Sequence, residues 1–143
     1  MARKNFWIAV VVGGIVVNIL DMFVQGMLFQ NVFYKNMTII RMDVNPLWYI
    51  LLDFLAVIVF TWFYDRVYSS FGGGVRAGMK YGMMYGVITS FPTMFYPQLM
   101  YEGYPYALVW ASIVYAIILG GILGSIVGKF YRKVDQQPSA AQA

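Results

Sequence analysis

Four long apolar runs dominate this sequence. They cover residues 6–29, 47–64, 78–96 and 106–130. Each is close to the roughly 20 residues that an α-helix needs to cross the hydrocarbon of a bilayer. The runs are too long for strands and do not alternate between apolar and polar residues. They predict an all-α fold, a polytopic membrane protein whose core is a bundle of four transmembrane helices.

The composition supports a membrane location. Hydrophobic residues make up 61% of the 143 residues and charged residues 11%, against about half and about a quarter in soluble domains. We expect one transmembrane domain over residues 1–134 and a polar, small-residue-rich tail over residues 135–143. The third run is the least regular because Pro92 interrupts it, and Pro97 is expected to end it.

The basic residues predict the orientation of the chain. With four crossings, eight of the ten fall on one side: Arg3, Lys4, Arg66, Arg76, Lys80, Lys129, Arg132 and Lys133. Only Lys35 and Arg41 fall on the other side. The positive-inside rule therefore predicts a multi-pass protein of the cell membrane with both termini in the cytoplasm. Basic residues placed beside apolar runs serve this orientation, so we expect no nucleic-acid partner.

The chain contains no cysteine and no histidine. Disulfides, thiolate metal sites and thiol catalysis are therefore excluded. The commonest metal ligand and the usual general base are missing as well. We expect no metal site, no cofactor and no enzymatic activity, although two aspartates remain as a candidate acid/base pair for a membrane enzyme acting on lipid.

Glycines recur at intervals of four residues. The third run has Gly78, Gly82 and Gly86, with Gly74 four residues before Gly78. The fourth run has Gly120, Gly124 and Gly128, and the first has Gly14. Such spacing is typical of a glycine zipper, in which small residues let helix backbones approach closely in lipid. Two interpretations are open. The third and fourth helices pack on each other or on the first helix through Gly14, or one glycine stripe faces another protein chain.

Polar residues within the runs form a candidate site. Gly14, Asn18, Asp21 and Gln25 fall within about 60° of one another on the first helix. Asp21 lies roughly 12 Å from the outer end of its helix, and Asp53 lies roughly 9 Å from the same side. The predicted site comprises Asn18, Asp21, Gln25, Asp53, Thr89 and Thr93. Ser112 and Tyr115 of the fourth helix could also approach it.

An ionised carboxylate at this depth costs at least a few kcal/mol, so both aspartates should face the interior of the bundle. No lysine or arginine lies at that depth. The carboxyl groups are then protonated, or they bind a cation or hydrogen-bond donors. One hypothesis is a proton- or cation-binding site. The alternative is a set of structural polar contacts between helices.

Two short motifs carry a resemblance. They are Asp21-x-x-x-Gln25-Gly26-x-Leu28 and Tyr81-Gly82-x-x-x-Gly86. With the four runs, they resemble small four-helix bacterial integral membrane proteins of unknown function. That resemblance implies the topology and a bacterial inner membrane, and it brings no activity. Related chains often carry a histidine where Gln25 stands, and this departure puts a metal or proton-relay role in doubt.

Three classes of function fit the sequence. The preferred one is a non-catalytic accessory or assembly subunit of a larger membrane complex, because the loops are short and the glycine stripes favour packing. The alternative is a small proton- or cation-coupled transporter or channel that uses Asp21 and Asp53. A lipid-modifying enzyme is the third. The expected partners are the lipid bilayer and either other membrane subunits or a second copy of the chain.

Overall fold

The computed structural model describes residues 3–37 and 44–131, and nearly all of them are helical. The elements in chain order are α1 (Arg3–Phe23), the π-helical segment η1 (Val24–Phe29), α2 (Gln30–Val32), the 3₁₀ segment η2 (Tyr34–Asn36), α3 (Pro46–Phe71), α4 (Val75–Met100) and α5 (Tyr106–Tyr131). The predicted tail, Arg41, Arg132 and Lys133 lie outside the described residues.

The all-α prediction is confirmed, and each of the four apolar runs lies within a helix. Among the described residues, three helical segments are long and apolar enough to cross a membrane, namely Lys4–Val32, Pro46–Phe71 and Tyr106–Tyr131. The fourth long helix, α4, has 26 residues but carries Arg76, Lys80 and two internal prolines. The described residues are therefore almost entirely helical, and α4 is the least apolar of the four long helices.

Local sequence explains where α3 and the tight turns begin and end. The side chain of Asn45 caps α3 by accepting a hydrogen bond from the Leu47 N–H at 3.0 Å, and Pro46 fills the first turn, where a missing N–H does no harm. Gly72 and Gly74 have φ values of 67° and 100° and form the turn into α4. A side chain at either position would be strained.

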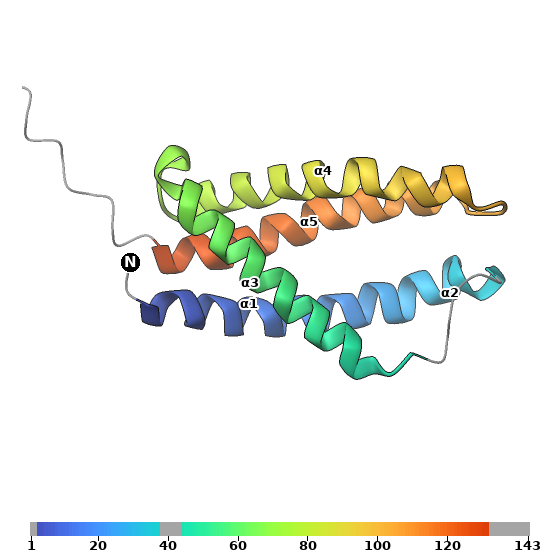
Figure 1. The fold of residues 1–143 in the computed structure, drawn as a ribbon, viewed down its shortest axis with the longest axis horizontal. Helices are drawn as coiled ribbons and strands as arrows, with labels where there is room; N and C mark the ends of the chain where they lie inside the picture. The colour runs from blue at the N-terminus through green and yellow to red at the C-terminus, as the bar shows by residue number, and fades with distance from the viewer. Residues whose placement is uncertain (1–2, 38–43, 132–143) are drawn as a thin grey trace, which may run out of the picture.

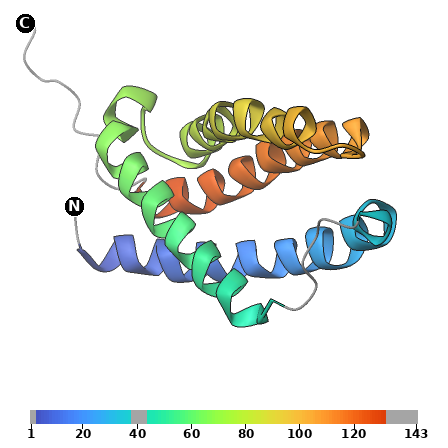
Figure 2. The same ribbon diagram turned by 45° about the vertical axis from the view of Figure 1, so that its right-hand side comes forward.

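The four long helices differ in how closely they pack on one another. Helices α4 and α5 run side by side along their whole length, and α1 lies next to α5 (Figure 1). Helix α3 crosses the bundle obliquely (Figures 1 and 2). It begins beside α1, and its second half contacts α4, where Phe60 packs on Tyr81 and Tyr85. The start of α1 and the end of α5 are tied by a hydrogen bond from the Asn5 amide to the Phe130 carbonyl.

The core lies mainly at one end of the bundle. We call this the basic end, because the exposed cations Lys4, Arg66, Arg76, Lys80 and Lys129 lie there. Its buried rings are Phe60, Tyr64, Tyr81 and Tyr131, which pack with centroids 5.0–5.1 Å apart. At the opposite end, by contrast, residues 46–52 of α3 are all exposed. The bundle is therefore closed at the basic end and splayed at the other.

The prediction that Pro97 ends the third segment is wrong. Helix α4 continues through Pro92 and Pro97 to Met100, and the Tyr101 N–H closes the last turn on the Pro97 carbonyl. An apolar environment favours this continuation, because every backbone group released from a helix there loses a partner. Hydroxyl groups supply extra donors nearby, since Ser90 and Thr93 donate to carbonyls of the preceding turn at 2.5 Å.

Candidate functional site

Three helices bring polar side chains together in the splayed half of the bundle. Asp21 comes from the end of α1, Asp53 from the second turn of α3, and Tyr115 from the middle of α5. The Tyr115 hydroxyl donates a hydrogen bond to Asp21 Oδ1 at 2.5 Å. The Asp53 carboxyl lies close enough to that of Asp21 for a hydrogen bond between the two side chains. We call these three residues the acidic cluster.

The π-helical segment η1 shapes the α1 side of this cluster. It starts three residues after Asp21 and contains Gln25, whose amide donates to Asp21 Oδ1 at 3.2 Å. In an ideal α-helix, positions 21 and 29 would differ by about 80° in direction. A π-turn rotates less per residue, and both Asp21 and Phe29 contact Tyr115. Single π-turns within α-helices are frequent at functional sites.

The acidic cluster brings two carboxyl groups within hydrogen-bonding reach of each other. A carboxylate oxygen can only accept hydrogen bonds, so a bond between Asp21 and Asp53 requires a proton on one of them. Two ionised carboxyl groups in contact also repel each other strongly away from water. Within the described residues, three or more acidic side chains are nowhere gathered as a multidentate metal site would require.

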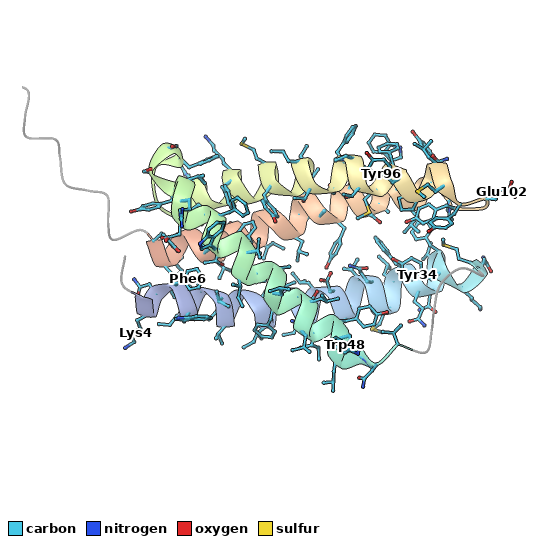
Figure 3. All side chains as sticks on the ribbon, viewed as in Figure 1. Lys4, Phe6, Tyr34, Trp48, Tyr96 and Glu102 are labelled. Atoms are coloured by element: carbon cyan, nitrogen blue, oxygen red, sulfur yellow. The ribbon has the colours of Figure 1, made fainter. Side chains whose placement is uncertain are left out.

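Tyr34 lies near this cluster, toward the end of the bundle opposite the basic end. Tyr34 follows α2 and is half-buried at the end of the bundle far from Lys4 (Figure 3). Burial raises the pKa of the Tyr34 phenol, and Tyr104, Asp21 and Tyr49 raise it further. Tyr34 therefore stays neutral at physiological pH and offers a hydroxyl group that can both donate and accept a hydrogen bond.

Three of the predicted site residues make their hydrogen bonds to their own helices and not to the acidic cluster. Asn18 donates to the Gly14 carbonyl of its own helix at 2.9 Å. Thr89 donates to the Tyr85 carbonyl at 2.7 Å, and Thr93 to the Thr89 carbonyl at 2.5 Å. The structure thus brings together Asp21, Asp53 and Gln25, while Asn18, Thr89 and Thr93 bond to their own backbones. Tyr115, which the sequence presented only as a residue that could approach, is the main donor.

The glycines of α4 and α5 face each other. A Cβ added at Gly82 would collide with the Gly120 carbonyl, and one at Gly78 with the Gly124 carbonyl. A Cβ at Gly86 would lie 2.5 Å from the Ala116 oxygen, and one at Gly128 would lie 2.5 Å from the Gly74 oxygen. The glycines therefore let the two backbones touch. Gly14 has a different neighbour, since a Cβ there would meet the Phe54 ring of α3.

No protein-family model matches this chain, and no curated protein or solved structure is significantly similar to it. The fold and the site therefore define only a class. This class is a helical protein with three helices long and apolar enough to cross a membrane, joined to a fourth helix through a glycine-lined contact.

Proposed function

We propose that the chain crosses the cell membrane four times with both termini in the cytoplasm. The length of α4 supports this, because 26 residues span about 39 Å and the helix stays beside α5 throughout. The segregation of charge also supports it, since Lys4, Arg66 and Lys129 are exposed at one end. Lys80 lies in the second turn of α4, where its long side chain can reach the headgroups.

The absence of cysteine makes this topology easy to test. Single-cysteine variants Ser70→Cys and Glu102→Cys place one thiol at the end of α3 and one in the α4–α5 turn. A membrane-impermeant maleimide should label Ser70→Cys only in inverted vesicles and Glu102→Cys only in intact cells. Labelling of both thiols from the same side would show that α4 does not cross the membrane.

Within that topology, we propose that the chain acts as a non-catalytic accessory or assembly subunit of a larger membrane complex. The splayed half of the bundle carries this proposal. Residues 46–52 of α3 are exposed, and so are Gln25 and Gly26 of η1. A small residue beside an amide on an exposed face is typical of helix–helix contacts in lipid. A partner helix would cover surface that this chain leaves open.

A bulky substitution at Gly26 tests the subunit proposal. An added Cβ there has no neighbour closer than 4.0 Å, at Met22 Cγ, so Gly26→Leu should leave the fold intact. The variant should shift the complex purified in mild detergent to a smaller size, with unchanged helical content by circular dichroism. Ala107→Leu, at an exposed position of α5, is the control and should keep the native size. A wild-type chain that migrates as a monomer would overturn the proposal.

The acidic cluster favours a second candidate, a small proton- or cation-coupled transporter or channel. A proton shared between Asp21 and Asp53 on two different helices could be taken up and released as those helices move. The assay is proton or cation flux into liposomes. Asp21→Asn and Asp53→Asn should abolish it, whereas Glu102→Gln in the exposed turn should not. Absence of flux from the wild type, or equal flux from all variants, would contradict this function.

A further inference from the structure

One cation at the basic end is held in place by an aromatic ring. The Arg66 guanidinium lies over the Trp62 ring, 4.7 Å from its centroid. Both side chains are exposed, Trp62 to 45%. The neighbouring acidic residue, Asp65, lies beside the buried Tyr131 hydroxyl. Among residues 3–37 and 44–131, no ion pair involves Arg66, so its charge is available to a ligand.

An apolar stripe continues from this arginine along the outer surface of α3. Leu55, Val59, Trp62 and Arg66 follow one another at intervals of four, three and four residues, which places them on one helix face. Leu55 is exposed to 55% and Val59 to 38%. The eleven residue steps from Leu55 to Arg66 correspond to about 16 Å. This is close to the hydrocarbon thickness of one leaflet, about half of 30 Å.

The surroundings of Arg66 are positively charged. Lys4, Arg76, Lys80 and Lys129 are exposed at the same end of the bundle. We call these four residues and Arg66 the basic collar. Such a group of cations attracts anionic lipids, and each basic residue near the surface contributes about 1 kcal/mol. Arginine suits a phosphodiester because its planar fork can donate two parallel hydrogen bonds. A guanidinium already held by Trp62 also loses less side-chain freedom when it binds.

We infer that Arg66 and Trp62 form a binding site for one anionic phospholipid, with the phosphate at Arg66 and an acyl chain along Leu55, Val59 and Trp62. The site requires only that the basic end of α3 meets a membrane leaflet. It is independent of whether the protein acts as a subunit or as a transporter.

Tryptophan quenching by brominated lipids tests this site directly. The chain has four tryptophans, so Trp7→Phe, Trp48→Phe and Trp110→Phe together leave Trp62 as the single fluorophore. Vesicles of phosphatidylcholine would contain either brominated phosphatidylglycerol or brominated phosphatidylcholine. We expect Trp62 to prefer phosphatidylglycerol by about fivefold, the factor that corresponds to one basic contact at a membrane surface.

Three charge variants separate a local site from a diffuse effect. Arg66→Gln should remove most of the preference, whereas Arg76→Gln in the same collar and Lys35→Gln at the opposite end should keep it. Equal quenching by both lipids in the parent protein would overturn the inference, as would an equal loss of preference from Arg66→Gln and Arg76→Gln. Excess inorganic phosphate should not compete, and competition would show a general anion site instead of a lipid site.

Discussion

Replacing Gly120 by alanine should weaken the contact between α4 and α5. The added Cβ would collide with the Gly82 carbonyl oxygen, and it would lie 3.0 Å from the Gly82 carbonyl carbon and 3.6 Å from the Gly86 nitrogen. All three are backbone atoms of a helix and cannot rotate away. The adjacent Gly121 provides a matched control, because a Cβ there would meet only the flexible Met83 and Met79 side chains, at 3.1 Å and 3.8 Å from their Cγ atoms.

The magnitude follows from the displacement that the collision requires. To reach ordinary van der Waals distance, the two backbones must separate by on the order of 1 Å, and a gap of that size forfeits about a quarter to a half of each atomic attraction across the contact. Overpacking of this kind typically costs about 1–3 kcal/mol. Alanine recovers up to about 1 kcal/mol of helix propensity. We therefore expect a net loss of about 0–2 kcal/mol for Gly120→Ala. Gly121→Ala should change stability little, because the same propensity gain offsets the 3.1 Å contact with the flexible Met83 side chain.

The assay is reversible unfolding in mixed micelles with increasing SDS, followed by far-ultraviolet circular dichroism and tryptophan fluorescence. Gly120→Ala should lower the midpoint and Gly121→Ala should leave it near that of the wild type. Equal midpoints for the two variants would refute the view that backbone contact through glycine holds α4 against α5. A loss confined to Gly121→Ala would refute it as well.

Three further predictions use the same unfolding assay. Tyr115→Phe removes the hydroxyl donor to Asp21 and should cost about 1–3 kcal/mol, whereas Tyr96→Phe on the exposed surface should change little. Asn45→Ala removes the side-chain cap of α3 and should cost about 0.5–2 kcal/mol, less if water replaces the cap. Burial raises the pKa of Tyr104 and contributes most to the raised pKa of Tyr34. The folded state therefore holds these protons more tightly than the unfolded state, so stability should fall as the pH rises above 10.0, the unperturbed phenol pKa. In a pH titration, tyrosinate absorbance should appear at a higher pH in the folded protein than in the unfolded protein.

Helix positions were predictable because hydropathy acts locally. Each apolar run lies within the helix that the structure shows, and counting 1.5 Å per residue placed Asp21 and Asp53 at a similar depth. In the structure their carboxyl groups lie side by side. Depth along two helices is thus informative about which polar side chains can meet, as long as each helix crosses the layer without a break.

The orientation of side chains around each helix was harder to predict. Thr89 and Thr93 lie at a suitable level, but a threonine hydroxyl in a helix has a carbonyl one turn earlier within reach, and both use it. The π-turn follows Asp21, which accepts a hydrogen bond from Tyr115 of α5. Helix α3 crosses α1 where the Phe54 ring packs against Gly14. Each contact joins residues that are far apart in the sequence. Neither leaves a local signal in composition or periodicity.

The basic end of the bundle is built from features that favour stability, and the splayed half contains several that do not. We therefore expect the Asp53→Asn variant to lose function without losing stability. At the basic end, buried rings and paired glycines agree with the fold. The splayed half combines two adjacent carboxyl groups with a π-turn and an exposed amide, features that a sequence selected only for stability would avoid. Asparagine keeps the shape of the side chain and supplies its own hydrogen-bond donor. The free energy of unfolding of Asp53→Asn should therefore equal that of the wild type or exceed it by up to about 1 kcal/mol. The variant should still lose whichever activity the cluster serves, flux in liposomes or assembly with a partner. If Asp53→Asn is destabilised as much as Gly120→Ala, the acidic pair is a structural contact between α1 and α3.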